Sequence, residues 1–442
     1  MENAFTRGQE EGSAIAIKLR ADNDFYSQIS QLKARGLPHT SEALATLPQF
    51  MECPMSEDGT VMVAKTGMGS SAALTSSLVG ALLSFFGAVH LPFIDDPLPL
   101  TEKLAVAPAN RSSPDGIATT NCSGLSESLA LTHNLAQACH CVAQGKVGSG
   151  FDVSAAIYGT HIYTRFSPSQ LLDALSAGDS PVSNRDVNRA PAKTSLERIA
   201  ACVRAPGGWD AERGVLRLPF CFRLLMGDVC GGSSTPSMVR KVQAWREDSA
   251  TACRAKDLWS SLGSTNIAIA EALNSLAAAA SSSVAASGKS FEDDAKVLAS
   301  IPASEWGDTR SIGDGALDVV TFQQLLQLKS SFAKARQLLR EMGEDAGVPI
   351  EPPVQTELID ATCALPGVLC AGVPGAGGVD AVFAIVVHPN AEGGVKDLWA
   401  SWSVCKGEER SKGRIGVVCP LLLTASKGDL QGGVTCTRKL SW

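Results

Sequence analysis

The sequence predicts a fold of the α+β class, and α/β is the alternative. Three observations lead there. Glycine turns separate apolar segments, residues 321–345 have the spacing of an amphipathic helix, and residues 368–387 show two apolar strands around a glycine turn. The 442 residues, of which 45% are hydrophobic, are enough for two or three domains with their own cores.

The N-terminal half alternates between strand and helix patterns. We expect a strand at 13–21, a helix–turn–helix segment at 23–50, a second strand at 59–64 and a helix at 72–87. An insertion loop at 90–124, a longer helix at 125–144, a glycine turn at 145–151 and a small-residue segment at 152–165 that ends in a strand follow.

The C-terminal half begins after a loop-rich stretch, where we place a domain boundary, so that the predicted domains are 1–205 and 206–442. A strand pair, a Gly/Ser turn that leads into a helix, an Ala/Ser-rich helix, a long amphipathic helix and the strand–turn–strand unit follow. These are residues 215–226, 231–245, 262–287, 321–345 and 368–387. The Ala/Ser-rich segment has helical spacing, and a linker is the alternative.

Charge and cysteine usage exclude several classes of protein. The net charge is -7 and no long basic tract occurs, so we expect neither a nucleic acid nor a membrane surface as partner. The 13 cysteines are scattered without a CxxC pair, which favours a reducing compartment over a disulfide framework or a zinc site. No secretory signal is visible at the N-terminus. We expect a cytoplasmic location, or a peroxisomal one if a targeting signal precedes Met1.

The first glycine turn, KTGMGSSAAL, stands before a small and apolar run at residues 65–87. Backbone N–H groups at a helix start bind anions, and glycines let a phosphate approach closely. A helix start capped by serine is the alternative from this motif alone, and a membrane span is a third. The lysine precedes the glycines, so the turn is not a Walker A loop, and a third glycine is missing for a dinucleotide fingerprint.

Two further glycine turns carry candidate functional residues. Asp152 follows GKVGSGF, where it can face a ligand or cap the next helix. So many glycines in GVPGAGG would destabilise a simple hairpin, so we expect close approach to a ligand or to another backbone there. Ser233, Ser234 and Thr235 form either another anion site or an ordinary cap. His133 and His140 share a helix face, and we favour a core or pocket-wall role over metal ligation.

In their order and spacing, KTGMGSSAAL, GKVGSGFDVSAAIYG and GVPGAGGVDAVFAI resemble the GHMP small-molecule kinases, and most closely the phosphomevalonate kinases of plant and fungal type. Supporting segments are HNLAQACHCVAQ, GGSSTPSMV and MGEDAGVPIEPPVQTELID. The resemblance covers residues 23–402. It implies a two-domain fold, with a ribosomal protein S5 domain 2-like N-terminal domain that is incomplete here and a ferredoxin-like C-terminal domain.

The resemblance also implies the reaction, in which ATP phosphorylates (R)-5-phosphomevalonate to (R)-5-diphosphomevalonate in the mevalonate pathway of isoprenoid and sterol biosynthesis. Other GHMP kinases, such as mevalonate or sugar kinases, are the alternative within enzymes. A catalytically inactive nucleotide-binding homologue is the alternative outside them.

The resemblance assigns roles to residues of the three turns. The nucleotide loop would comprise Lys65, Thr66, Gly67, Met68, Gly69, Ser70, Ser71 and Ala72. Asp152 would be the catalytic aspartate. Because two anions need a cation between them, we also expect Lys146, six residues before Asp152, to bind the acceptor phosphate and act in catalysis, with a solvated loop lysine as the alternative. Substrate would also contact Ser149, Gly375, Gly377 and Gly378, and Asp380 would support the pocket. Mg²⁺ would be held by Ser71 and Asp152, with Gln144 nearby.

Two departures from the family pattern stand out. The family's first strand and lysine-bearing motif have no counterpart in this chain, and we give their role to neither Lys18 nor Lys65. We therefore expect a truncated or degenerate form, whose C-terminal half folds and whose kinase activity alone is weak or absent. Cys230 stands where the family has a glycine, which indicates an altered loop. The sequence leaves the oligomeric state open.

Overall fold

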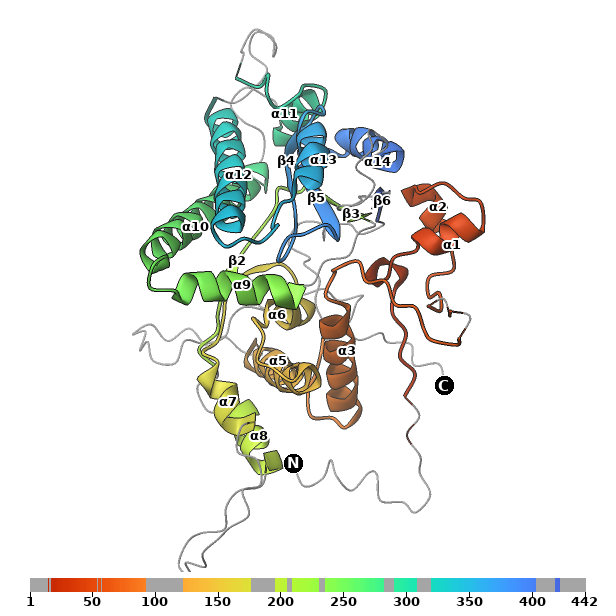
Figure 1. The fold of residues 1–442 in the computed structure, drawn as a ribbon, viewed down its shortest axis with the longest axis vertical. Coiled ribbons are helices and arrows are strands. Elements are labelled where there is room, and N and C mark those ends of the chain that lie inside the picture. Colours follow the sequence, from red (N-terminus) through yellow and green to blue (C-terminus); the bar gives the residue numbers. More distant parts are fainter. Residues whose placement is uncertain are drawn as a thin grey trace, which may run out of the picture. The chain divides into compact units, whose positions relative to one another are not determined.

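The computed structural model describes residues 15, 17–53, 55–56, 58–92, 122–175, 195–204, 209–229, 235–281, 290–307, 319–402 and 418–421. Contacts between Cα atoms divide the chain into two compact units. We call them the helical unit, which contains Gly69–Leu216, and the sheet unit, which contains Ala21–Met68 and Arg217–Ala425. Figure 1 shows the elements of both.

The helical unit is built around three helices that pack on one another. Its helices are α3 (Ser70–Phe85), α5 (Cys122–Gln144), α6 (Phe151–Tyr158), α7 (Ser169–Leu175) and α8 (Ser195–Val203). Small buried side chains, Ala72, Val79, Ala136 and Val153, let α3, α5 and α6 approach closely. Strands β1 (His161–Thr164) and β2 (Glu212–Val215) form a two-stranded antiparallel sheet.

The sheet unit contains an antiparallel sheet in the order β4-β5-β3-β6. Its strands are β3 (Arg223–Val229), β4 (Val368–Gly372), β5 (Ala381–Val386) and β6 (Val418–Pro420). Helices separate β3 from β4, β4 and β5 form a hairpin, and among the described residues η5 (Pro389–Ala391) and α14 (Glu392–Ser401) precede β6. This is the β-α-β-β-α-β arrangement of ferredoxin-like folds.

The helices of the sheet unit fall into an N-terminal group and a larger group between and after the strands. They are η3 (Asn23–Phe25), α1 (Ile29–Ala34), α2 (Ser41–Ala45), α9 (Thr235–Glu247), α10 (Ala252–Ser281), α11 (Phe291–Leu298), α12 (Val319–Asp345), α13 (Pro353–Cys363), η5 (Pro389–Ala391) and α14 (Glu392–Ser401). The N-terminal group packs on the sheet, since Leu32 of α1 and Leu44 of α2 share a buried cluster with Met226 of β3.

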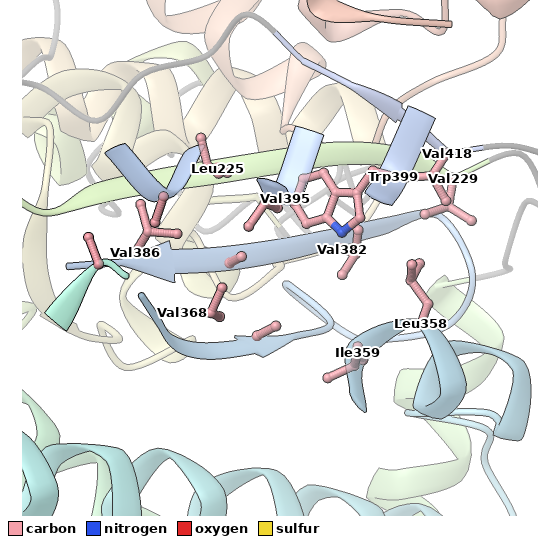
Figure 2. Close-up of a cluster of buried hydrophobic side chains, with 14 residues drawn as sticks. Leu225, Val229, Leu358, Ile359, Val368, Val382, Val386, Val395, Trp399 and Val418 are labelled. Atoms are coloured by element: carbon pink, nitrogen blue, oxygen red, sulfur yellow. The ribbon is translucent and has the colours of Figure 1, made fainter. Parts of the chain in front are cut away.

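The core of the sheet unit gathers around Trp399 of α14. Figure 2 shows its indole among valines of the sheet and of α14, including Val382 and Val395. Trp399 is fully buried, and its indole N–H donates to the hydroxyl of Thr362 on α13 at 3.0 Å. A large apolar ring with a satisfied polar tip therefore links both helices to the sheet.

The structure confirms the α+β class and most predicted elements. The helices expected over 72–87, 125–144 and 321–345 are α3, α5 and α12, and the strand–turn–strand unit is β4 with β5. The Ala/Ser-rich segment is helix α10, not a linker. The ferredoxin-like order agrees with the predicted C-terminal domain, while the ribosomal protein S5 domain 2-like domain and the boundary at 205/206 stay predictions.

Several local predictions were wrong, because a strand needs a partner that its own sequence does not supply. Residues 59–64 form no strand and make only an isolated bridge between Met55 and Val61. The described part of 13–21 is irregular. The predicted strand pair of 215–226 is split, since β2 pairs with β1 and β3 pairs with β5 and β6. The prediction of a loop around residues 167–213 was also wrong, since α7 and α8 lie in this stretch.

The insertion expected at 90–124 lies mostly outside the described residues. Among the helices that the structure describes, none is long and apolar enough to cross a membrane. The run after the first glycine turn forms α3.

We expect Trp399→Ala to destabilise the sheet unit by about 3–5 kcal/mol, because it removes a buried ring and leaves a cavity. Trp399→Phe should cost less, since it keeps most of the packing and loses mainly the hydrogen bond to Thr362. Urea unfolding followed by circular dichroism measures both. Trp259→Ala is the matched control, because that ring is 38% exposed. Equal losses for Trp399→Ala and Trp259→Ala would contradict the assigned role.

Candidate active site

Helix α3 begins at a glycine and not at a capping serine. Its N-cap is Gly69, in the left-handed conformation with φ 72°, and no side chain caps the helix. Ser70 and Ser71 lie in the first turn, so the serine-capped alternative from the sequence is wrong. The backbone N–H groups of this turn, at the positive end of the helix dipole, are suited to bind an anion.

Helix α6 begins in the same way, at Gly150 with φ 75° and no side-chain cap. Asp152 lies in its first turn, and its Oδ1 accepts the N–H of Val153 at 2.9 Å. Asp152 is therefore not the N-cap residue. A Cβ atom on Gly69 would lie 3.5 Å from the Cβ of Asp152, so the starts of α3 and α6 come together beside this carboxylate.

His140 of α5 connects the two helix starts. Its Nε2 lies 3.1 Å from the Ser71 hydroxyl, 3.0 Å from the Gln144 amide nitrogen and 4.0 Å from Asp152 Oδ2. His140 is 5% exposed, which agrees with the core or pocket-wall role predicted for the two histidines. The sequence analysis did not predict the contact between His140 and Ser71. A usable signal was that His140 lies 12 residues before Asp152, on the helix that leads into the second glycine turn.

The second glycine turn is held through its carbonyl groups. The Val147 carbonyl accepts from the Arg165 guanidinium at 3.2 Å, and the Ser149 carbonyl accepts from the Tyr163 hydroxyl at 3.2 Å. Lys146 is exposed, and within the described residues its ammonium makes no ion pair. The turn thus has a fixed backbone and a lysine with a free head group.

The predicted nucleotide loop divides between the two units, with residues 65–68 in the sheet unit and 69–72 in the helical unit. Thr66 is fully buried, and its hydroxyl donates to the Asp24 carbonyl at 2.7 Å, so this side chain anchors the loop. Met68 packs on the cluster of α1 and α2. Lys65 and Gly67 are exposed, and Ala72 is a core residue.

The third glycine turn makes a close backbone approach, as the sequence predicted. A Cβ on Gly377 would lie 2.3 Å from the Ile350 carbonyl oxygen, and this carbonyl accepts the Gly378 N–H at 2.8 Å. The partner is thus another backbone, which gives Gly377 and Gly378 a structural reason to be glycine. Gly375 is exposed, with open space where a side chain would stand. A Cβ on Gly67 would lie 3.9 Å from the Cβ of Asp380, which follows this turn.

An ion-pair network fixes the segment that Gly377 meets. Arg336 of α12 donates two hydrogen bonds to the Glu351 carboxylate, at 2.8 and 2.6 Å, and one to Asp360 at 2.6 Å. Burial opposes the charge on Arg336, but the hydrogen bonds from Glu351 and Asp360 outweigh it and raise the pKa of the guanidinium. The 348–351 turn thereby supports the third glycine turn through the Ile350 carbonyl.

Asp228 of β3 is a buried carboxyl in the sheet unit, 3% exposed. It accepts a hydrogen bond from Ser27. Burial raises the pKa of Asp228 to about 6, the Ser27 hydroxyl lowers it, and the negative charge of Asp380 raises it.

The two histidines of α5 have different surroundings. His133 is fully buried between Tyr158 and Trp209, which confirms a core role.

The described residues contain no group of three or more His, Cys, Asp or Glu side chains that could hold a metal ion. Ser233, Ser234 and Cys230 lie outside the described residues, and the side chain of Thr235 is likewise not described.

Comparison with known proteins identifies the family. No model of a protein family matches the chain. The peroxisomal phosphomevalonate kinase of Arabidopsis thaliana is 36% identical over 401 residues, which cover 88% of this chain and 68% of that protein. Phosphomevalonate kinase erg8 of Aspergillus fumigatus is 32% identical over 419 residues, 94% of this chain and 67% of that protein. The chain belongs to the phosphomevalonate kinase family.

Family membership confirms the predicted class of phosphotransferase and the resemblance drawn from the three glycine turns. Among solved structures, a phosphomevalonate kinase of Streptococcus pneumoniae in complex with phosphomevalonate and AMPPNP is 13% identical. It gives a TM-score of 0.39 over 78% of this chain and 85% of that one. A similarity of this size carries no conclusion here.

Asp228 provides a pH test of the sheet unit. The pKa of the Asp228 carboxyl is 3.8 in the unfolded chain and about 6 in the folded chain, so the folded state binds the proton more tightly. Stability from this group is present below pH 3.8 and is lost as the pH rises through 6, by up to about 3 kcal/mol. Asp228→Asn should therefore gain stability relative to the unsubstituted protein between pH 4 and 7. Urea unfolding at several pH values measures the free energy of unfolding of both proteins. A difference between Asp228→Asn and the unsubstituted protein that stays constant with pH would contradict the assignment.

Proposed function

We propose that the chain transfers the γ-phosphoryl group of ATP to the phosphate of (R)-5-phosphomevalonate. The observation that carries the proposal is the meeting of two uncapped helix starts, α3 and α6, beside the Asp152 carboxylate. Phosphoryl transfer depends mainly on positioning and on neutralising charge, and two helix N-termini supply oriented N–H groups for phosphate oxygens.

The residues of the helical unit suit a magnesium nucleotide. The Ser71 hydroxyl and the Asp152 carboxylate both lie within 4.0 Å of the same nitrogen, Nε2 of His140. Mg²⁺ prefers oxygen ligands and is usually held by one or two carboxylates together with substrate phosphates. Ser71 and Asp152 would hold the ion, which would neutralise charge on the phosphates. In this proposal His140 and Gln144 orient the Ser71 hydroxyl.

The acceptor is itself a phosphate, so the nucleophile is already an anion and needs no strong base. Asp152 then orients the attacking oxygen, and the backbone N–H groups of Ser70 and Ser71 hold the nucleotide phosphates. Two anions must be brought together, which requires cations. The exposed Lys146 on the fixed second glycine turn is suited to bind the acceptor phosphate, together with Ser149. Substrate contacts from Gly375, Gly377 and Gly378 of the sheet unit stay a prediction from the sequence.

Other properties expected from the sequence remain proposals. They include a cytoplasmic location, although the Arabidopsis relative is named as peroxisomal, and small molecules as the only partners. A mevalonate or sugar kinase activity would appear in a panel of acceptors. An inactive homologue would bind ATP or phosphomevalonate without turnover.

A coupled assay of ADP release tests the function. We expect ADP formation that requires 5-phosphomevalonate and Mg²⁺, and that mevalonate and sugars do not support. Kinases generally turn over about 1–100 times per second, and this range is the scale against which the measured rate is compared. Nucleotide binding with no turnover for any acceptor would overturn the proposed reaction.

We expect Asp152→Asn to lower kcat at least about 100-fold, because the variant loses the charge that orients the acceptor and holds the metal. Nucleotide affinity without Mg²⁺, measured by calorimetry, should change little, since the backbone of α3 is intact. If the variant keeps its turnover, the assignment of Asp152 is wrong.

Lys146→Met should raise KM for phosphomevalonate by about 10–100-fold, which corresponds to one lost charge-assisted hydrogen bond. KM for ATP should stay the same. Lys33→Met on α1 is the control, since it removes another exposed lysine. Equal kinetics for the two variants would return Lys146 to the role of a solvated loop lysine.

A further inference from the structure

Three neighbouring polar side chains of α5 form a buried network that ends at the second glycine turn. Asn134 is 6% exposed, and His133 and Gln137 are fully buried. Gln137 Nε2 lies 2.7 Å from the Gly150 carbonyl oxygen and 3.1 Å from His133 Nε2. His133 Nδ1 lies 3.0 Å from Asn134 Oδ1. The network therefore runs from Asn134 through His133 and Gln137 to the residue that starts α6.

The direction of the hydrogen bond to Gly150 follows from its acceptor. The Gly150 carbonyl can only accept, so the Gln137 atom that faces it is the nitrogen. The second proton of that nitrogen is within reach of His133 Nε2, and His133 Nδ1 lies 3.0 Å from Asn134 Oδ1 and 3.2 Å from a guanidinium nitrogen of Arg213. The ring stays neutral, because burial lowers the pKa of His133 to about 3 and the nearby Arg213 charge lowers it too.

Gly150 and Gln137 fit each other sterically. A Cβ on Gly150 would lie 2.7 Å from the Gln137 amide, and the φ of 75° also disfavours a side chain. The Gln137 amide thus occupies the space that any other residue at 150 would fill. The Gln137 amide contacts the Gly150 peptide directly before Phe151 and Asp152. The direction of the first turn of α6 therefore depends on the position of this amide.

The network leaves one group without a partner. Gln137 Oε1 is buried and has no hydrogen-bond partner in the part of the chain that the structure describes. An unpaired buried acceptor costs about 1–3 kcal/mol, which an apolar side chain of the same size would avoid. A residue chosen for core stability alone would not carry this cost, whereas a residue that aims the Gly150 peptide needs its N–H group.

We propose that Gln137, oriented by His133, is a positioning residue for phosphoryl transfer. It holds the Gly150 carbonyl and so fixes the start of α6, with its N–H groups and Asp152, relative to α3. The inference rests on the proposed function for its effect on rate. Its structural part, the control of the α6 start, stands without it.

Gln137→Met tests the proposal, because it keeps the length of the side chain and removes the donor. We expect kcat to fall about 10–100-fold through misplacement of Asp152, with KM for ATP changed less than 3-fold. The matched control is Thr132→Val, which removes a fully buried α5 hydroxyl whose hydrogen bond goes to Ser128 in the same helix. Its thermal stability should fall while kcat is retained. Equal kcat values for the two variants would overturn the proposal.

Hydrogen exchange separates this proposal from the proposed function. In Gln137→Met, the backbone amides of Val153 and Ser154 should exchange at least about 10-fold faster, and those of α3 should be unchanged. If the unsubstituted chain shows no kinase activity, the proposed function fails, and the exchange result alone decides the positioning role. Unchanged exchange at the α6 start would overturn it.

Gln137→Glu gives a readout that a merely structural role would not move. The protonated carboxyl can donate to the Gly150 carbonyl, while the carboxylate repels it. His133 on α5 contacts residue 137 directly, Arg213 on β2 lies 3.2 Å from His133, and Asp152 on α6 follows Gly150 by two residues. We expect its kcat, relative to the unsubstituted enzyme, to fall as the pH rises from 6 to 8.5. A constant ratio would contradict the requirement for a donor at this position.

Discussion

The geometry of the site depends on the direction in which α6 starts, and one buried hydrogen bond controls it. The Gln137 amide holds the Gly150 carbonyl at 2.7 Å, and Gly150 takes a left-handed conformation that leaves room for this amide. Asp152 then lies in the first turn, beside Gly69 at the start of α3. Without this constraint the two helix starts would not present their N–H groups around one carboxylate.

The sheet unit solves a related problem with a different contact. Its third glycine turn lies against the Ile350 carbonyl, which is possible only because Gly377 has no side chain. Arg336 holds the adjoining Glu351 with two hydrogen bonds, so the segment that receives the turn is itself fixed. In both units a glycine turn is positioned by a buried polar side chain or a backbone carbonyl from a distant segment. Both turns therefore have specific contacts that hold their backbone, although glycine-rich chains are flexible by themselves.

Membership of the phosphomevalonate kinase family gives a reason for the two helix starts of the helical unit. Enzymes that join two phosphate groups must hold several negative charges close together, and helix N-termini do so without mobile side chains. The buried His133 ring is neutral, because burial and the nearby Arg213 charge both lower its pKa, so the ring itself adds no charge to the network behind the turn.

The sequence by itself determined the long elements and the chemistry of the turns. Helices α3, α5 and α12 followed from local periodicity, and the three glycine turns carried the family resemblance. It also indicated the candidates Asp152, Ser71 and Lys146, because residue type and order along the chain carry that information.

Only the tertiary structure decided which backbones meet. Residues 59–64 have a strand-like sequence but make only an isolated bridge with Met55 and join no sheet in the part of the chain that the structure describes, while β2 and β3 are close in sequence and join different sheets. The same holds for the side chains behind the site. Gln137 lies 13 residues before Gly150 and its amide contacts that peptide only after α5 packs on α6, so no local pattern could reveal that it sets the direction of α6.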